Sequence, residues 1–156
     1  MPERLRRLDQ TFQRLPIYFV TASTYKHQAS LDNPDVQKRL IDFAEEGEKL
    51  GAWLGAYVLM PDHLHLFVVV DAERLTLSEW MKSLKNSLSK VLREKCASSP
   101  HWQKGFFDHI LRSEDSYSEK WDYVRENPVR AALVKHWRDW PFIGEVFDLE
   151  FRRGAS

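Results

Sequence analysis

Two histidines separated by a single leucine are the first residues in this sequence whose types and spacing could do chemistry. His63 and His65 begin an apolar, β-branched run, residues 63–70, that is typical of a strand. Alternate residues of a strand point to the same face, so the two imidazoles converge on one point a few ångströms above the sheet. The pair follows a short Pro61-Asp62 joint, where solvent and substrate can reach it. This is the geometry of a two-histidine metal clamp, although a His-x-His pair alone more often serves packing or lies on the surface.

Tyr123 and Asn127 form the second candidate site. They stand four residues apart at the end of a predicted helix, 113–126, which Asn127-Pro128 terminates, so the phenol and the carboxamide share one helical face. Asn127 precedes Pro128, and an asparagine there is also a good N-cap for a short helix through Val134. Partly buried tyrosines are ordinary, so this pair alone predicts only a soluble domain.

The elements that position these residues follow from periodicity and from turn signals. Strands are predicted at 15–24, 51–60, 63–70 and 105–111, and helices from Asn33-Pro34 to about Lys49, from the Thr76–Glu79 capping box onward, and at 113–126. The two-residue joint between 51–60 and 63–70 favours an antiparallel hairpin. The order predicts an α+β fold, a ferredoxin-like sandwich with a mostly antiparallel sheet and flanking helices. We expect a basic arm at 1–14, one domain at 15–144 and a tail at 145–156.

Composition describes an ordinary globular chain of 156 residues with a formal net charge of zero. The charge is nevertheless uneven, because residues 77–95 carry a net charge of +3 and residues 31–50 carry −3. A cluster this small is by itself typical of a solvated face. The single cysteine and the charged start, which lacks the apolar block of a secretory leader, favour a cytoplasmic protein. The longest apolar stretch is the ten residues 51–60, so we expect no segment that spans a membrane. The 6 Trp, 5 Tyr and 9 Phe indicate a dense core or base-stacking surfaces.

Three separate segments agree with one known family in order and in spacing. They are Met60–Leu66 (MPDHLHL), His101–His109 (HWQKGFFDH) and Tyr123–Leu133 (YVRENPVRAAL). Together they resemble the single-tyrosine HUH transposases, most closely the bacterial branch called REP-associated tyrosine transposases, over about residues 21–141. The resemblance implies that His63 and His65 are metal ligands, that Asn127 is the third ligand, and that Tyr123 is the nucleophile.

The sequence departs from the family pattern at three places. Asp62 stands where the family usually has Asn, Ala132 where it usually has Gly, and residues 142–144 where a Ser-Ser pair often follows Trp-Pro. None of these touches the implied catalytic set. Asp62 adds a negative charge beside the metal.

The resemblance further implies metal-dependent nicking and strand transfer on single-stranded DNA, often a hairpin from a repetitive extragenic palindrome. The divalent ion is expected to be Mg²⁺ or Mn²⁺, and the product a 5′-phosphotyrosine with a free 3′-hydroxyl. A phenol has a pKa of about 10 and needs activation, by the metal or by Lys120 three residues earlier on the same face. We expect a monomer or homodimer. The candidate DNA contacts are Lys82, Lys85, Lys90 and Arg93 on the basic helix and Arg4, Arg6 and Arg7 in the arm.

Two other functions remain compatible with the sequence. A regulator could keep the fold, bind nucleic acid and cleave nothing. A histidine-based metallohydrolase would use water and would survive the loss of Tyr123, although no third histidine or carboxylate ligand is evident in a motif. A covalent adduct between protein and DNA separates the transposase from both.

Overall fold

The computed structural model describes residues 15–112 and 117–149. The strands are β1 (Ile17–Ser23), β2 (Ala52–Leu59), β3 (His63–Val70), β4 (Phe107–Leu111) and β5 (Ile143–Glu145). The α-helices are α2 (Pro34–Gly47), α3 (Leu77–Glu94), α4 (Tyr117–Val124) and α5 (Asn127–Arg130), and the 3-10 turns are η1 (Tyr25–His27), η2 (Glu48–Leu50) and η3 (Trp137–Asp139). No helix in these described ranges is long and apolar enough to cross a membrane.

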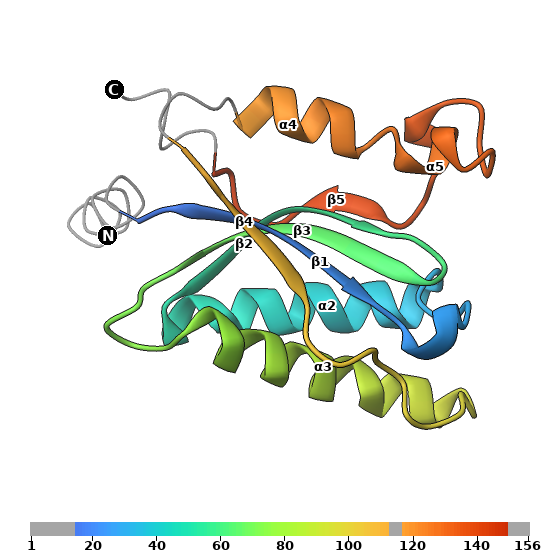
Figure 1. Ribbon diagram of the computed structural model, residues 1–156, viewed down its shortest axis with the longest axis horizontal. Coiled ribbons are helices and arrows are strands. Elements are labelled where there is room, and N and C mark those ends of the chain that lie inside the picture. Colours follow the sequence, from blue (N-terminus) through green and yellow to red (C-terminus); the bar gives the residue numbers. More distant parts are fainter. Residues whose placement is uncertain (1–14, 113–116, 150–156) are drawn as a thin grey trace.

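The five strands form one sheet in the order β4-β1-β3-β2-β5, and every neighbouring pair is antiparallel. The order of the first four is that of a ferredoxin-like fold, so the predicted α+β class is confirmed. Helices α2 and α3 cover one face of the sheet, and α4 with α5 lies over the other (Figure 1). Strand β4 is an edge strand, paired with β1 alone.

Local sequence signals place the first elements correctly. Asn33 accepts a hydrogen bond from the backbone N–H of Val36 and begins α2. Thr76 and Glu79 form the predicted reciprocal capping box of α3. Strands β2 and β3 pair as the predicted hairpin around residues 60–62.

The register of that hairpin shifts between Leu54 and Tyr57. The irregularity contains Gly55, where an added Cβ would lie 2.5 Å from Leu149 Cδ1 and 2.7 Å from Tyr117 Oη. A bulge changes which residues share a face, so Leu54 and Tyr57 both join the core beneath α2 and α3. Ala56 instead joins the core on the α4 face.

The α4 face of the sheet has its own buried core. Tyr117 is 1% exposed and packs edge-on against Phe67 of β3, and its hydroxyl accepts the backbone N–H of Ala56 at 2.8 Å. Leu149 is fully buried in the same cluster. The contacts of Tyr117 and Leu149 therefore hold α4 against the face of the sheet that carries the histidines.

The end of the domain differs from the boundary predicted at residue 144. Strand β5 reaches Glu145, and the N–H groups of Val146 and Phe147 then donate to the carbonyls of Gly55 and Leu54. The packed domain thus extends at least to Leu149. The predicted 1–14 arm lies outside the described residues, as does the start of the helix predicted at 113–126, of which 117–124 are described as α4.

Candidate metal centre

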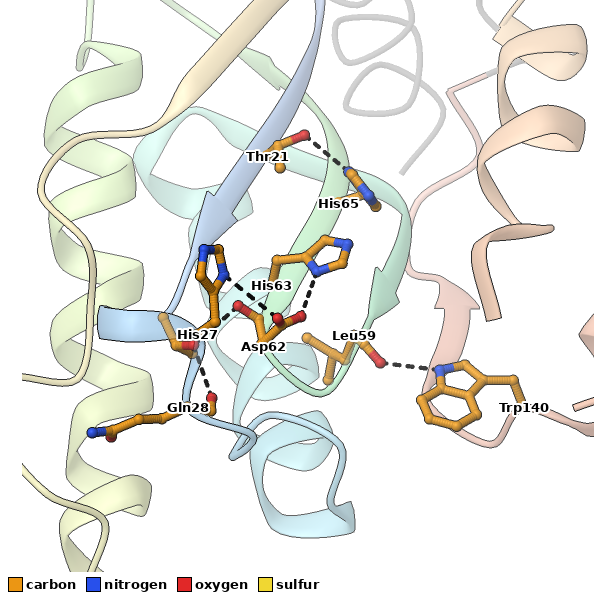
Figure 2. Close-up of polar contacts among 9 residues, drawn as sticks. Thr21, His27, Gln28, Leu59, Asp62, His63, His65 and Trp140 are labelled. Carbon is orange, nitrogen blue, oxygen red and sulfur yellow. Dashed lines mark hydrogen bonds and ion pairs between the residues drawn. The ribbon is translucent and has the colours of Figure 1, made fainter. Parts of the chain in front are cut away.

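His63 and His65 lie side by side on the α4 face of the sheet, as the strand pattern predicts. Their rings are 4.9 Å apart between centroids and nearly perpendicular. Antiparallel pairing places them opposite Ser23 and Thr21 of β1. Figure 2 shows both rings at the start of β3, close to the turn that leads into the strand.

Each imidazole is held through its Nδ1 atom by an oxygen. His63 Nδ1 lies 2.8 Å from Asp62 Oδ1, and His65 Nδ1 lies 2.9 Å from Thr21 Oγ1 (Figure 2). The tautomer with its hydrogen on Nδ1 donates these bonds and leaves Nε2 with a lone pair. Metal-ligating histidines are normally oriented in this way, by a carboxylate, a carbonyl or another oxygen behind the ring.

The surroundings keep His65 in the neutral form that ligates metal. Burial lowers its pKa to about 4, and electrostatic interactions with His63, Arg130 and Lys120 contribute to the lowering. The ring also stacks on Phe19, with centroids 5.5 Å apart. At physiological pH this imidazole therefore needs to lose no proton before it binds a cation.

Asp62, the residue that departs from the family pattern, is part of this cluster. Its hydrogen bond to His63 is the largest cause that lowers its pKa, so the carboxylate is charged. A second histidine, His27 of η1, places its Nδ1 atom 3.5 Å from Asp62 Oδ2 (Figure 2). The carboxylate thus orients the His63 ring and places a negative charge beside the Nδ1 atoms of His63 and His27.

These donors fit a divalent cation. Imidazole nitrogens and amide or carboxylate oxygens suit Mn²⁺ and other first-row ions. In the described ranges there is no group of three or more His, Cys, Asp or Glu side chains that could hold a metal. The third ligand that the resemblance implies, the amide oxygen of Asn127, is of a different type.

Tyr123 projects from α4 with 64% of its surface exposed. The guanidinium of Arg130 lies 4.1 Å from the centre of its ring, and Arg130 Nη2 donates to the backbone carbonyl of Tyr123 at 2.7 Å. Lys120, on the same helix, places its ammonium 5.2 Å from the Phe19 ring, which in turn stacks on His65. One cation, Arg130, therefore stacks on the ring of the exposed phenol, and Arg130 and Lys120 both help to lower the pKa of His65.

Asn127 does not cap the short helix as the alternative interpretation predicts. It is the first residue of α5, whose N-cap position is Glu126, and that helix ends at Arg130 rather than near Val134. The side-chain Nδ2 instead donates to the carbonyl of Val124, the last residue of α4, at 2.8 Å. This bond fixes the amide by its nitrogen and leaves its oxygen as the group available to a cation.

The predicted DNA contacts on α3 lie on the other side of the sheet from the histidines (Figure 1). Lys82, Lys90 and Arg93 are exposed. Lys85 is half-buried, donates to the carbonyls of Gln103 and Gly105 at 3.2 and 2.5 Å, and has its pKa lowered by burial. Lys85 therefore fastens the loop before β4. Arg4, Arg6 and Arg7 lie outside the described residues.

Sequence reasoning missed two residues of the candidate metal centre, Thr21 and Arg130. Thr21 is 44 residues from His65, and only the register of β1 on β3 brings them together. Arg130 is seven residues after Tyr123, and this spacing on a continuous helix would have placed the two on one face. The prediction placed a helix boundary between them, which hid that signal.

Comparisons with known proteins agree with the predicted resemblance. Residues 11–127 match the family described as "Transposase IS200 like". The chain is 28% identical over 102 residues to the REP-associated tyrosine transposase of Escherichia coli K12, covering 65% of this chain and 58% of that protein. It is 27% identical over 97 residues to a putative REP-associated tyrosine transposase of Haemophilus influenzae, covering 56% and 55%. The chain thus spans little more than half the length of these relatives.

The fold is similar to that of a solved REP-associated tyrosine transposase bound to a REP hairpin. The TM-score is 0.66 at 21% sequence identity, over 85% of this chain and 88% of that one. This likeness supports the arrangement of sheet and helices described above.

Proposed function

Because this chain belongs to the IS200-like transposase family, we propose that it is a tyrosine transposase that nicks and rejoins single-stranded DNA through Tyr123. The observation that carries the proposal is the pair of histidines oriented by oxygens, on the sheet face covered by the helix of an exposed tyrosine. The two groups come from distant parts of the sequence. Simple packing needs neither the tethered Nδ1 atoms nor the exposed phenol.

In the proposed reaction the phenolic oxygen of Tyr123 attacks a phosphorus atom of the DNA backbone. A bond forms between phosphorus and the tyrosine oxygen, and the bond to the 3′ oxygen of the preceding nucleotide breaks. The phenol gives up its proton, and the leaving oxygen takes one up as a 3′-hydroxyl. One phosphodiester replaces another, so a later attack by a 3′-hydroxyl on the phosphotyrosine rejoins DNA without a nucleotide cofactor.

The side chains around the phenol have distinct proposed tasks. Arg130, stacked on the Tyr123 ring, holds the ring and offers a positive charge to the phosphate. Lys120 adds a second cation near His65 that favours the ionised phenol. These charges act where negative charge gathers as phosphorus is attacked.

His63, His65 and the amide oxygen of Asn127 would hold the divalent ion, Mg²⁺ or Mn²⁺. When bound, the ion supplies Lewis-acid polarisation of a phosphate oxygen and stabilises the leaving oxygen. Thr21 and Asp62 keep the two rings oriented, since each Nδ1 atom is already bonded. Two imidazoles and one amide leave positions open for the substrate.

We propose hairpin DNA with single-stranded flanks as the substrate. The solved relative of similar fold is described as bound to a REP hairpin, and the curated relatives are named for REP elements. Exposed Lys82, Lys90 and Arg93 on α3 are the proposed contacts to the backbone.

A denaturing gel tests the proposal. The protein is incubated with Mg²⁺ or Mn²⁺ and a panel of palindromic hairpin oligonucleotides with labelled flanks, and we expect a covalent adduct that survives denaturation. Tyr123→Phe should abolish the adduct and leave DNA affinity nearly unchanged. Tyr117→Phe on the same helix is the matched control and should still form adduct, since that side chain is buried.

Each alternative gives a different result in the same gel. Binding without any adduct or cleavage would identify a regulator. Cleavage that persists in Tyr123→Phe would identify a hydrolase that uses water. An adduct mapped by mass spectrometry to another tyrosine would refute the assignment of Tyr123.

A further inference from the structure

A cavity of about 310 Å³ opens beside the candidate metal centre. Its walls are Thr21 and Ser23 of β1 and residues 103–107, which form the loop before β4 and its first residue. This volume is at the small end of the range for ligand pockets. Neither the implied metal ligands nor Tyr123 line it, and Thr21, which orients His65, is the residue that the cavity shares with the metal centre.

The sheet register fixes the distance between this cavity and the histidines. Phe107 of β4 pairs with Thr21 of β1, which pairs with His65 of β3, so these three residues form one row across the sheet. Directly paired residues of antiparallel strands lie on the same face. Phe107 is therefore on the histidine face, two strand spacings or roughly 10 Å from His65. A nucleotide next to a phosphate held at the metal centre would reach this far.

The loop wall of the cavity is held in place from behind. Lys85 of α3 donates to the carbonyls of Gln103 and Gly105, and the N–H of Gln103 donates to the carbonyl of Ser23. The indole of Trp102 donates to Lys85 O and lies 3.1 Å from Ser89 Oγ. Gly105 adopts a φ of +77°, a left-handed conformation that favours glycine. The cavity is thus formed before any ligand arrives, which reduces the ordering cost of binding.

The side chains in the cavity match one chemical class. Phe107 is a large aromatic ring at the cavity wall, and 64% of its surface is exposed within the described part of the chain. Thr21, Ser23 and Gln103 supply hydroxyl and amide groups, and Lys104 carries the single charge among the described lining residues. An aromatic ring to stack on, an amide to read an edge and a cation for phosphate together suit a nucleotide with an unpaired base.

We propose that this cavity receives one unpaired base of the DNA strand immediately beside the phosphate that Tyr123 attacks. The base stacks on Phe107, Gln103 contacts its hydrogen-bonding edge, and Lys104 contacts the adjoining phosphate. The inference rests on the proposed function and gives it a specificity site, because a base enters the cavity only where the strand is unpaired. It explains why a nicking enzyme would choose one position in a single-stranded flank.

The test places abasic nucleotides one at a time along the flank of a hairpin oligonucleotide that the wild-type protein cuts. The initial rate of adduct formation is measured at subsaturating DNA. We expect one abasic position next to the cut to slow the wild-type protein roughly 5- to 150-fold, the range for loss of one stacked base. Phe107→Ala should lose the same factor on intact DNA and lose nothing further on that abasic substrate, whereas Phe107→Trp should retain the rate.

Ile110→Ala is the matched control. Ile110 is on the same strand and is 46% exposed, but it faces the α2 and α3 side of the sheet. It should cut every substrate as the wild type does, and circular dichroism should show equal folding of both alanine variants. Gln103→Ala should flatten the preference among the four bases at the sensitive position and at no other.

The outcomes separate this inference from the function on which it rests. If the wild-type protein forms adduct but Phe107→Ala matches Ile110→Ala on every substrate, the base site is refuted and the transposase stands. If the rate loss of Phe107→Ala is equal for all abasic positions, the side chain acts without reading a base, which also refutes it. If no oligonucleotide yields adduct with the wild-type protein, the proposed function fails and the base site fails with it.

Discussion

Replacing Thr21 by valine should weaken the binding of Mn²⁺ by a factor of ten to 100 while the fold stays intact. Valine keeps the size of threonine and removes Oγ1, which lies 2.9 Å from His65 Nδ1. Without that oxygen the ring loses the partner that fixes its orientation and its tautomer. The Nε2 atom then spends less time aimed at the ion with its lone pair free.

The magnitude follows from the geometry. Loss of an outer partner of a ligating histidine typically costs 10- to 100-fold in metal affinity, or about 1.4 to 2.7 kcal/mol. The folded protein loses one half-buried, neutral hydrogen bond, worth about 1 kcal/mol. For a domain of this size that loss lowers Tm by roughly 2–4 °C. Metal affinity should therefore fall much more than stability.

Titration with Mn²⁺, followed by the electron paramagnetic resonance signal of the free ion, measures the affinity without DNA. Because no DNA is present, the proposed base cavity, which Thr21 also lines, does not affect the measured metal affinity. Thr21→Ser should restore most of the affinity because it restores the oxygen. Ser23→Ala, two residues along the same face, is the control and should bind as the wild type does. A Thr21→Val protein that binds within twofold of wild type would refute the orienting role.

Three further predictions concern other parts of the site. Tyr117→Phe should lower the free energy of unfolding by about 1–3 kcal/mol in urea denaturation, because the buried N–H of Ala56 loses its acceptor, and an unchanged midpoint would contradict this. Asn127→Asp keeps an oxygen ligand but cannot donate to the last carbonyl of α4, so nicking should continue with a changed Mg²⁺/Mn²⁺ preference; identical metal titrations would argue against ligation. The double change Lys82→Ala with Arg93→Ala should reduce the slope of log affinity against log salt by roughly 1.4 in fluorescence anisotropy, and an unchanged slope would leave α3 a solvated face.

Features that depend on neighbouring residues were predictable from the sequence. The caps of α2 and α3 and the β2–β3 hairpin are set within a few residues, so their signals are local. The same-face placement of His63 and His65 follows from the strand period alone. Features that depend on distant pairing were not: β5 has only three residues and no pattern of its own, and Thr21 meets His65 only through strand register. The bond from Asn127 to the carbonyl of Val124 was missed because an asparagine before a proline is compatible both with an N-cap and with a metal ligand, and the sequence alone does not show which atoms of the amide are used.

The proposed DNA surface has two parts on opposite sides of the sheet. The histidines face α4, and the exposed cations Lys82, Lys90 and Arg93 belong to the helix on the other face. A single strand that contacts both must pass around a sheet edge. At the β4 edge lie the loop of residues 103–107 and its cavity, and Lys85 ties that loop to α3. A base held there would turn the strand between the two faces, so the basic helix would bind DNA on one side of the captured base and the tyrosine would cut on the other.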